Sequence, residues 1–194
     1  CEGIMENLQR KTRETNISLE LEIYGSGKAE ISTGIGFFDH MLEAFCKHAL
    51  FDMKLVCKGD LHVDFHHSVE DVGIVIGQAL REKIYPLSGV ERFGEATVVM
   101  DEAAVNCALD LSNRPFLVYE SISDGKVGEF DIELANEFFQ ALAFNAAITL
   151  HIAKIRGRNS HHILEASFKA CAVALRRALA KNARVGIPST KGVL

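Results

Sequence analysis

The sequence has no long apolar run and no block of basic residues. None of its hydrophobic stretches approaches the roughly 20 residues that a membrane-spanning helix requires. It also does not open with the basic and then apolar segment of a secretory signal. The 194 residues carry a net charge of -5, with Lys and Arg dispersed, whereas nucleic-acid-binding domains usually gather these residues on one face. These absences argue against a membrane protein and a nucleic-acid-binding protein, and they leave an ordinary globular protein, expected in the cytoplasm.

Cysteine is scarce and irregularly spaced. The five cysteines are odd in number and show none of the paired spacings of a zinc site or a disulfide framework. We therefore expect reduced thiols that serve mostly as small core residues in a cytoplasmic protein. A structural zinc knot, which usually uses cysteine ligands, is not expected.

What the sequence does contain, twice, is the pattern His-His-x-x-Glu. The first copy spans residues 66–70 and the second spans residues 161–165, in a chain with only eight histidines. On a helix, residues three or four positions before a Glu lie on its face, and two adjacent His side chains point about 100° apart. One His of each pair can therefore share a metal with the Glu while its neighbour reaches a different metal. Imidazole and carboxylate suit divalent ions of intermediate hardness, so the two copies predict two metal sites.

The two motifs belong to an internal duplication. Residues 66–80 align with residues 161–175, and both segments continue as an amphipathic helix. Residues 49–59 align with residues 147–157, each reading as a helix end followed by a short strand and a Gly turn. Earlier blocks match in the same order, with gaps that fall in loops. This preserved order favours duplication over chance similarity between helices.

The duplication gives the domain organisation. We assign residues 5–87 to a first half and residues 88–194 to a second half, which together form one compact catalytic unit. Residues 1–4 precede Met5 and are expected to be a tag remnant or a fusion junction. They are left out of the predicted fold.

Hydrophobic periodicity predicts the secondary structure. Apolar and polar residues alternate from Ile17 to Ile23, which predicts a half-buried strand, and Gly25-Ser26-Gly27 predicts a hairpin turn into a return strand over residues 28–33. Helices are predicted over residues 37–50, 69–84, 131–147 and 162–181, and further strands over 52–58, 94–100, 103–111, 115–121 and 149–156. Because a sheet with one polar face needs helices on the other, we expect an α+β fold of two similar β-β-α-β-α halves, with the helices packed between two sheets.

Each half also offers one ligand-type residue early in its first helix, His40 or Glu137. With the two motifs this makes eight candidate metal ligands, which are His40, His66, His67, Glu70, Glu137, His161, His162 and Glu165. Divided evenly, they give two sites of about four protein ligands, so an ion that prefers six ligands, such as Mn²⁺, would keep positions for water or substrate. Asp60, His62 and Asp64 could orient these histidines from behind, or they could lie on an exposed strand face.

Cationic and hydroxyl residues stand apart from the metal motifs. The candidates for binding an anion are Arg92, Arg114, Lys169, Ser189, Thr190 and Lys191. A Gly-flanked Ser-Thr-Lys tail suits phosphate because backbone amides and hydroxyls can wrap it. Each residue alone could be an ordinary solvated surface group. Beside two metal sites, the set predicts a phosphorylated small-molecule substrate.

Several blocks of the chain resemble the imidazoleglycerol-phosphate dehydratase family. They run in the family's order from residues 10–15 (RKTRET) and 36–41 (GFFDHM), through the two His-His-x-x-Glu motifs, to residues 189–194 (STKGVL). They cover nearly the whole chain. The resemblance implies the duplicated α+β fold predicted above, related to a ribosomal-protein-like domain 2. It also implies a cage of twenty-four subunits whose active sites lie at subunit interfaces and hold two Mn²⁺ ions each.

The resemblance also assigns roles to residues. The first metal would be held by His40, His67, His161 and Glu165. The second would be held by His66, Glu70, Glu137 and His162, where Glu137 stands at a position that is His in part of the family. The positions that match the substrate-phosphate site are Arg92, Arg114, Lys169, Ser189 and Lys191. The catalytic positions are Glu14, His48 and Glu165, with Glu14 as the base.

The implied reaction is the dehydration of imidazole glycerol phosphate to imidazole acetol phosphate in histidine biosynthesis. The proton to be lost is not next to a carbonyl and is not acidic. Metals at both ring nitrogens would allow an imidazolate to expel the neighbouring hydroxyl and form a diazafulvene, which acidifies the adjacent C–H. Two other functions stay open from the residues alone, namely a dimetal phosphatase or other hydrolase and a non-enzymatic metal-binding cage. A hydrolase of this kind would release inorganic phosphate from the substrate. A metal-binding cage would not explain the anion-binding residues.

Overall fold

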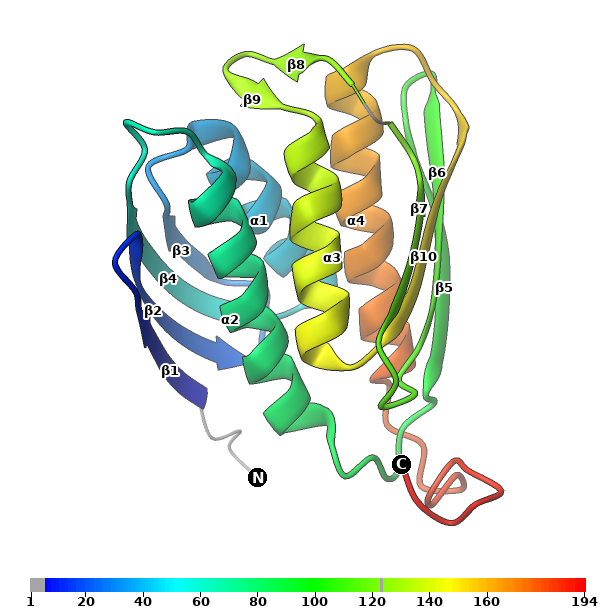
Figure 1. Ribbon diagram of the computed structural model, residues 1–194. Helices are drawn as coiled ribbons and strands as arrows, with labels where there is room; N and C mark the ends of the chain where they lie inside the picture. The colour runs from blue at the N-terminus through cyan, green and yellow to red at the C-terminus, as the bar shows by residue number, and fades with distance from the viewer. Residues whose placement is uncertain (1–5, 123) are drawn as a thin grey trace.

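The computed structural model describes residues 6–122 and 124–194 and places four helices between two four-stranded sheets (Figure 1). In spatial order the first sheet contains β1 (Glu6–Lys11), β2 (Thr15–Glu22), β4 (Asp52–Gly59) and β3 (Ala29–Ser32). The second contains β5 (Phe93–Met100), β6 (Ala103–Asp110), β10 (Thr149–Arg156) and β7 (Phe116–Glu120). The helices are α1 (Gly36–Ala49), α2 (His66–Ile84), α3 (Glu133–Ala146) and α4 (Ser160–Ala178), and the short strands β8 (Lys126–Val127) and β9 (Phe130–Asp131) precede α3.

The two sheets share one topology. In each, the first two strands form an antiparallel pair, the last strand pairs antiparallel with the second, and the third strand pairs in parallel with the last. The predicted α+β fold, with helices between two sheets, is confirmed. α2 ends at Ile84 and β5 begins at Phe93, on either side of the predicted division between residues 87 and 88. Residues 1–4, predicted to be a remnant or junction, lie outside the described residues.

The predicted hairpin through Gly25-Ser26-Gly27 is wrong. β3 pairs with β4, and β4 lies between β3 and β2. The carboxylate of Asp52 at the start of β4 accepts hydrogen bonds from Ser26 N (2.8 Å) and Lys28 N (2.9 Å). The glycine-rich loop therefore wraps around the end of β4 before β3 begins. A turn signal is local, so it does not reveal which strand the returning chain will join.

Both motif helices begin earlier than periodicity predicts. α2 begins at His66 instead of residue 69, and α4 begins at Ser160 instead of residue 162. The reason lies just before each motif, because Asp64 accepts a hydrogen bond from His66 N (2.9 Å) and Asn159 accepts one from His162 N (3.2 Å). Such side-chain acceptors satisfy amides at a helix start. Each motif therefore lies wholly within the first turns of a helix.

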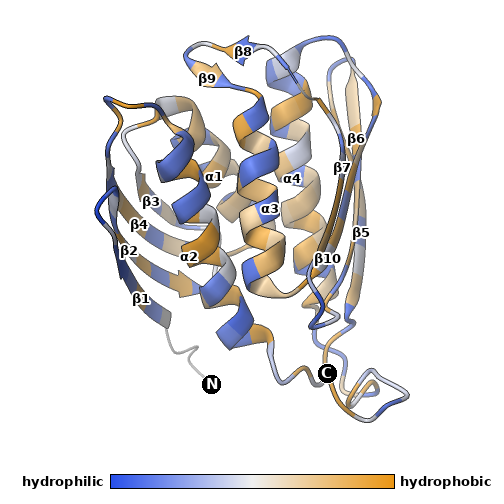
Figure 2. Cartoon of the chain, viewed as in Figure 1, coloured by the Kyte–Doolittle hydropathy of each residue, from blue (hydrophilic) through white to orange (hydrophobic). Residues whose placement is uncertain are grey.

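The core lies between the sheets and the helices. The alternation predicted for β2 is present, with Ile17, Leu19 and Leu21 at most 1% exposed and Ser18 on the outer face. Figure 2 shows hydrophobic colouring along the middle of α3 and α4, between the two sheets. β1 was not predicted because Leu8 is the only large apolar residue in its sequence. Within the described ranges, no helix combines the length and apolarity needed to cross a membrane.

Glycines allow close approaches between elements of this core. α2 packs against α3, where an added Cβ at Gly73 would lie 2.8 Å from Ala141 Cβ and one at Gly77 would lie 2.7 Å from Asn145 Cβ. These contacts position α2, which carries the first motif at its start, against α3. The tightest case joins β5 to α4, because a Cβ on Gly94 would lie 1.9 Å from Ala174 O. Backbone atoms cannot move aside as a flexible side chain can.

Gly94→Ala is therefore expected to destabilise the protein by about 1–3 kcal/mol, the usual cost of forcing extra atoms into a packed region. Chemical denaturation of the variant and of the unmodified protein measures the difference. Gly36→Ala is the matched control, because a Cβ at Gly36 meets nothing within 4 Å. Equal stability of the Gly94 variant would contradict the close approach of β5 and α4.

Candidate active site

Three ligand-type side chains converge near the starts of α1 and α4, and we call them the α1–α4 cluster. Glu165 Oε2 lies 3.0 Å from His161 Nε2 and 3.6 Å from His40 Nε2. One donor atom from each residue lies within 4.8 Å of the other two. His161 and Glu165 are four residues apart on α4 and so share a helix face, while His40 comes from α1. The ring of Phe37 lies edge-on to His161 with centroids 5.3 Å apart, which limits how far that imidazole can turn.

Glu165 is the buried member of the cluster, with its side chain 8% exposed. Lys169, one turn further along α4, donates to Glu165 Oε1 over 2.7 Å. Burial raises the pKa of the Glu165 carboxyl, but Lys169 and the nearby imidazoles outweigh burial, so the pKa lies below its ordinary value. The carboxylate is therefore charged, with one oxygen held by Lys169 and the other turned toward two imidazoles.

The first motif sends its two histidines in different directions. The rings of His66 and His67 have centroids 6.2 Å apart and lie at 89° to each other. His66 Nε2 lies 3.6 Å from Glu70 Oε2, four residues further along α2. His66 therefore lies beside Glu70, while the ring of His67 faces a different direction.

His67 faces two carboxylates. Its Nδ1 donates a hydrogen bond to Asp60 Oδ2 over 2.9 Å, and Glu14 Oε2 lies 3.7 Å from the same nitrogen. The hydrogen bond to Asp60 raises the pKa of His67. With Nδ1 committed to Asp60, Nε2 is the nitrogen available to bind a metal. Asp60, considered above as an orienting residue, has the geometry for that role.

His162 in the second motif also has a carboxylate partner, which sequence reasoning missed. Its Nδ1 donates to Glu102 Oε2 over 2.7 Å. Glu102 Oε1 accepts from the backbone N–H groups of Arg158 (3.1 Å) and Asn159 (2.7 Å). Hydrogen bonds from His162 and from these amides lower the pKa of Glu102 to about 2. The signal available in the sequence was an acidic residue just before a strand, which is also where Glu14 stands in the first half.

Glu137 lies half-buried on α3. Gly73 of α2 faces Phe138 and Ala141, and Gly77 faces Leu142 and Asn145 one turn later, so the two helices run in parallel. The turn of α3 that carries Glu137 is therefore level with the start of α2, where the first motif lies. Its position is compatible with the predicted second metal site.

The structure brings together part of each predicted ligand set. Of the first set, His40, His161 and Glu165 form the α1–α4 cluster, while His67 lies against Asp60. Of the second set, His66 and Glu70 are neighbours, while His162 lies against Glu102. Among the described residues of a single chain, only the α1–α4 cluster gathers three such side chains.

Five of the six predicted anion-binding residues line one pocket of about 740 Å³. The turn after β6 and the C-terminal tail form its walls. The predicted residues that line it are Arg92, Arg114, Ser189, Thr190 and Lys191. We call this the tail pocket, and its cationic and hydroxyl lining suits a phosphate group.

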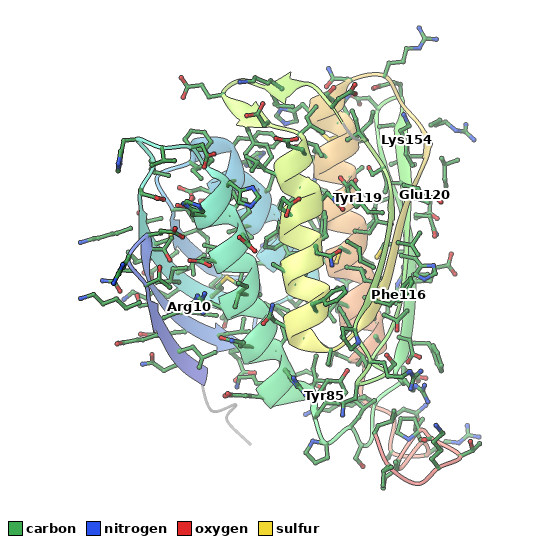
Figure 3. The ribbon with its side chains drawn as sticks, in the orientation of Figure 1. Arg10, Tyr85, Phe116, Tyr119, Glu120 and Lys154 are labelled. Atoms are coloured by element: carbon green, nitrogen blue, oxygen red, sulfur yellow. The ribbon has the colours of Figure 1, made fainter. Side chains whose placement is uncertain are left out.

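Arg92 and Tyr85 hold the two walls of the tail pocket in place. The Arg92 guanidinium donates to both carboxylate oxygens of Asp110 (2.7 and 3.1 Å) and to Pro188 O (2.6 Å). Tyr85, labelled in Figure 3, accepts a hydrogen bond from Asn113 N over 3.0 Å. Arg92 therefore fixes the tail, and Tyr85 fixes the turn that carries the next residue, Arg114.

The sixth predicted residue, Lys169, lies with Glu165 and not in the tail pocket. His48, predicted to be catalytic, lies nearby on the last turn of α1. Burial, followed by the charges of Lys169 and Arg176, lowers the pKa of His48. The neutral imidazole is therefore favoured beside these two cations.

The tail pocket and the α1–α4 cluster lie toward opposite ends of α4. Arg92 N donates to Ala178 O at the end of the helix, whereas the cluster lies around Glu165. Glu165 and Ala178 are thirteen positions apart, which at 1.5 Å per residue corresponds to about 20 Å along the helix. Side chains shorten this gap only in part, so two sites on one chain are well separated.

Comparison with known proteins identifies relatives over the whole chain. The family described as imidazoleglycerol-phosphate dehydratase matches residues 33–175. The imidazoleglycerol-phosphate dehydratase of Campylobacter curvus is 75% identical over 186 residues, which cover 95% of each chain. That of Campylobacter concisus is 73% identical over 194 residues, covering 100% of this chain and 99% of the relative.

Solved structures agree with the sequence relatives. The dehydratase from Staphylococcus aureus is similar with a TM-score of 0.84 and 39% identity, covering 92% of this chain and all of that chain. The Pyrococcus furiosus protein, solved in complex with (S)-C348, gives a TM-score of 0.83 at 39% identity, covering 96% of this chain and all of the other.

Proposed function

This chain belongs to the imidazoleglycerol-phosphate dehydratase family, and from that membership we propose that its histidine and carboxylate clusters hold two Mn²⁺ ions in active sites shared between copies of the chain. The enzyme is a hydro-lyase of histidine biosynthesis, and it converts imidazole glycerol phosphate to imidazole acetol phosphate. The hydrolase and the non-enzymatic cage are therefore set aside.

The donor atoms fit divalent ions of this kind. The α1–α4 cluster offers two imidazole nitrogens and a charged, buried carboxylate oxygen within 4.8 Å of one another, a set that suits Mn²⁺ and its neighbours in the first transition series. In the complete sites that the sequence predicts, His67 would join His40, His161 and Glu165 as ligands of one ion. The ligands of the other ion would be His66, Glu70, Glu137 and His162. Bound ions would act as Lewis acids toward the imidazole ring and hold it in place.

The protein's own side chains prepare this site. Lys169 neutralises Glu165 from behind and keeps Oε2 facing the imidazoles. Asp60 and Glu102 each accept a hydrogen bond from the Nδ1–H group of a motif histidine, which leaves Nε2 available for a metal. Glu14 is the proposed base, because its side chain is 52% exposed and lies near His67 without the short hydrogen bond that Asp60 makes.

The single observation that supports a shared site is the distance between metal cluster and tail pocket. A substrate with three carbons between ring and phosphate spans less than half of about 20 Å, at roughly 1.5 Å per bond. By this helix-length comparison, one molecule is too short to extend from the α1–α4 cluster to the tail pocket of the same chain. We propose that the pocket of one copy serves the metals of another, within the twenty-four-subunit cage of the family.

We also place the enzyme in the cytoplasm. The four cysteines among the described residues, Cys46, Cys57, Cys107 and Cys171, are buried free thiols. This state is the usual one in a reducing compartment. It supports the expectation from cysteine spacing.

Chelation tests the metal proposal. After exhaustive treatment with a chelator and its removal, the protein is expected to lose ketone formation from imidazole glycerol phosphate and to regain it with added Mn²⁺. Metal analysis of the restored enzyme should give two ions per chain. Added Mg²⁺ is the control for a simple charge effect. A full rate in protein shown to be metal-free would contradict the proposal.

A further inference from the structure

The duplication places two turn carboxylates at equivalent positions. Glu14 directly precedes β2, and Glu102 directly precedes β6, in sheets of the same topology. The strand that follows each residue starts beside a glycine at the end of a neighbouring strand. In the first half Thr15 pairs with Gly59. In the second half Ala103 lies beside Gly157, where an added Cβ would be 3.0 Å from Ala103 Cβ. Glu14 and Glu102 are thus structural counterparts.

Each counterpart approaches the second histidine of its own motif, but at a different distance. Glu102 Oε2 lies 2.7 Å from His162 Nδ1, whereas Glu14 Oε2 lies 3.7 Å from His67 Nδ1. The first distance is a hydrogen bond and the second is not. In the first half, Asp60 makes the hydrogen bond instead, at 2.9 Å.

The residue after the equivalent glycine explains the difference. Asp60 follows Gly59 in the first half, and Arg158 follows Gly157 in the second. Arginine has no acceptor atom, so it cannot accept a hydrogen bond from an imidazole N–H. With no acid at that position, the carboxylate that holds His162 comes from the turn, and Glu102 is fixed there by the amides of Arg158 and Asn159.

We infer that Glu102 is a positioning residue, which holds His162 in the tautomer and orientation that leave Nε2 free for a metal, while Asp60 does this for His67 and so leaves Glu14 free for the substrate. The inference rests on the proposed metal function. His162 Nε2 is available for this purpose, since the Asp101 carboxylate beside it lies 3.8 Å away on a side chain that is 80% exposed. The duplicated turn carboxylate has thus taken two different roles.

Glu102→Gln is the variant that tests the inference. The Gln oxygen can still accept from the two backbone amides, which turns its NH₂ group toward His162 Nδ1. Two donors then face each other, so the imidazole must accept at Nδ1 and carry its proton on Nε2, the nitrogen meant for the metal. We expect about 10–100-fold weaker binding of one Mn²⁺, the usual effect of losing such an orienting partner, and nearly full kcat once Mn²⁺ is saturating.

Three measurements separate this role from a merely structural one. Mn²⁺ titration followed by electron paramagnetic resonance should show one weakened ion and one unchanged ion per chain. Thermal unfolding of the metal-free variant should match the unmodified protein, because the loop hydrogen bonds are kept. Glu120→Gln, an exposed β7 residue labelled in Figure 3, is the matched control and should change nothing.

The outcomes distinguish the two proposals. If the unmodified protein binds no Mn²⁺, the metal proposal fails and takes this inference with it. If the unmodified protein binds two ions and Glu102→Gln binds both equally well, only the role of Glu102 is overturned. A metal-free variant with a lowered unfolding temperature and both ions weakened alike would assign Glu102 to the fold alone.

Discussion

Glu14→Gln is expected to lower kcat by about 10²–10⁴-fold, the range associated with loss of a general base. Glutamine has the shape of glutamate but cannot take a proton at neutral pH. Its neighbour His67 keeps the hydrogen bond to Asp60 at 2.9 Å. The metal-binding and substrate-binding groups are therefore left in place, and the loss should appear in kcat with little change in bound Mn²⁺.

Steady-state kinetics, metal analysis and calorimetric titration of substrate into the variant measure these three quantities. Glu30→Gln is the matched control, because Glu30 lies exposed on β3, with its carboxylate 4.0 Å from Lys54 Nζ. A rate within a few-fold of the unmodified enzyme would remove Glu14 from the role of base. Loss of an ion would instead make Glu14 a ligand.

Two inactive variants are expected to restore activity when they assemble together. Glu165→Ala removes the carboxylate of the α1–α4 cluster, and the double change Arg114→Ala, Lys191→Ala removes two cations from the tail pocket. Each variant alone should lose about 10²-fold or more in rate, as is usual for removing such charged groups. If cluster and pocket come from different copies, random mixing in one assembly gives about a quarter of the sites both parts intact.

Co-expression with two different affinity tags, followed by purification on both, yields the mixed assemblies for assay. The control is a mixture of the two variants purified separately and combined just before the assay, in which copies have not exchanged. Recovery in the co-expressed sample alone supports shared sites. No recovery in doubly purified assemblies would mean that each chain supplies both parts of its own site.

Much of the fold was predictable because its signals are local. Alternation gave β2, and helical periodicity gave four helices. The strand order was not predictable from the sequence. The loop around Asp52 places β3 on the far side of β4, and no local sequence pattern indicates that position. β1 was missed because a strand with a single large apolar residue has no alternation to detect. The start of each motif helix was predicted late because Asp64 and Asn159 act outside the hydrophobic pattern.

The candidate site was predictable where chemistry follows residue type. Paired motifs named the ligand-type residues, and five of the six anion-binding residues do line one pocket. Lys169 was placed in that set although its spacing of four residues from Glu165 on a predicted helix already favoured the ion pair that the structure shows. Glu102 was missed because a lone acidic residue in a turn has no distinctive pattern. Its meaning depends on the equivalence of two turns in space.

The length of α4 has a consequence for how the protein is used. If the metal cluster of one copy works with the tail pocket of another, as proposed, each copy contributes a cluster to one active site and a pocket to a second. A closed assembly then contains as many complete active sites as chains. A single copy would hold two incomplete sites, so we expect activity only from the assembled protein.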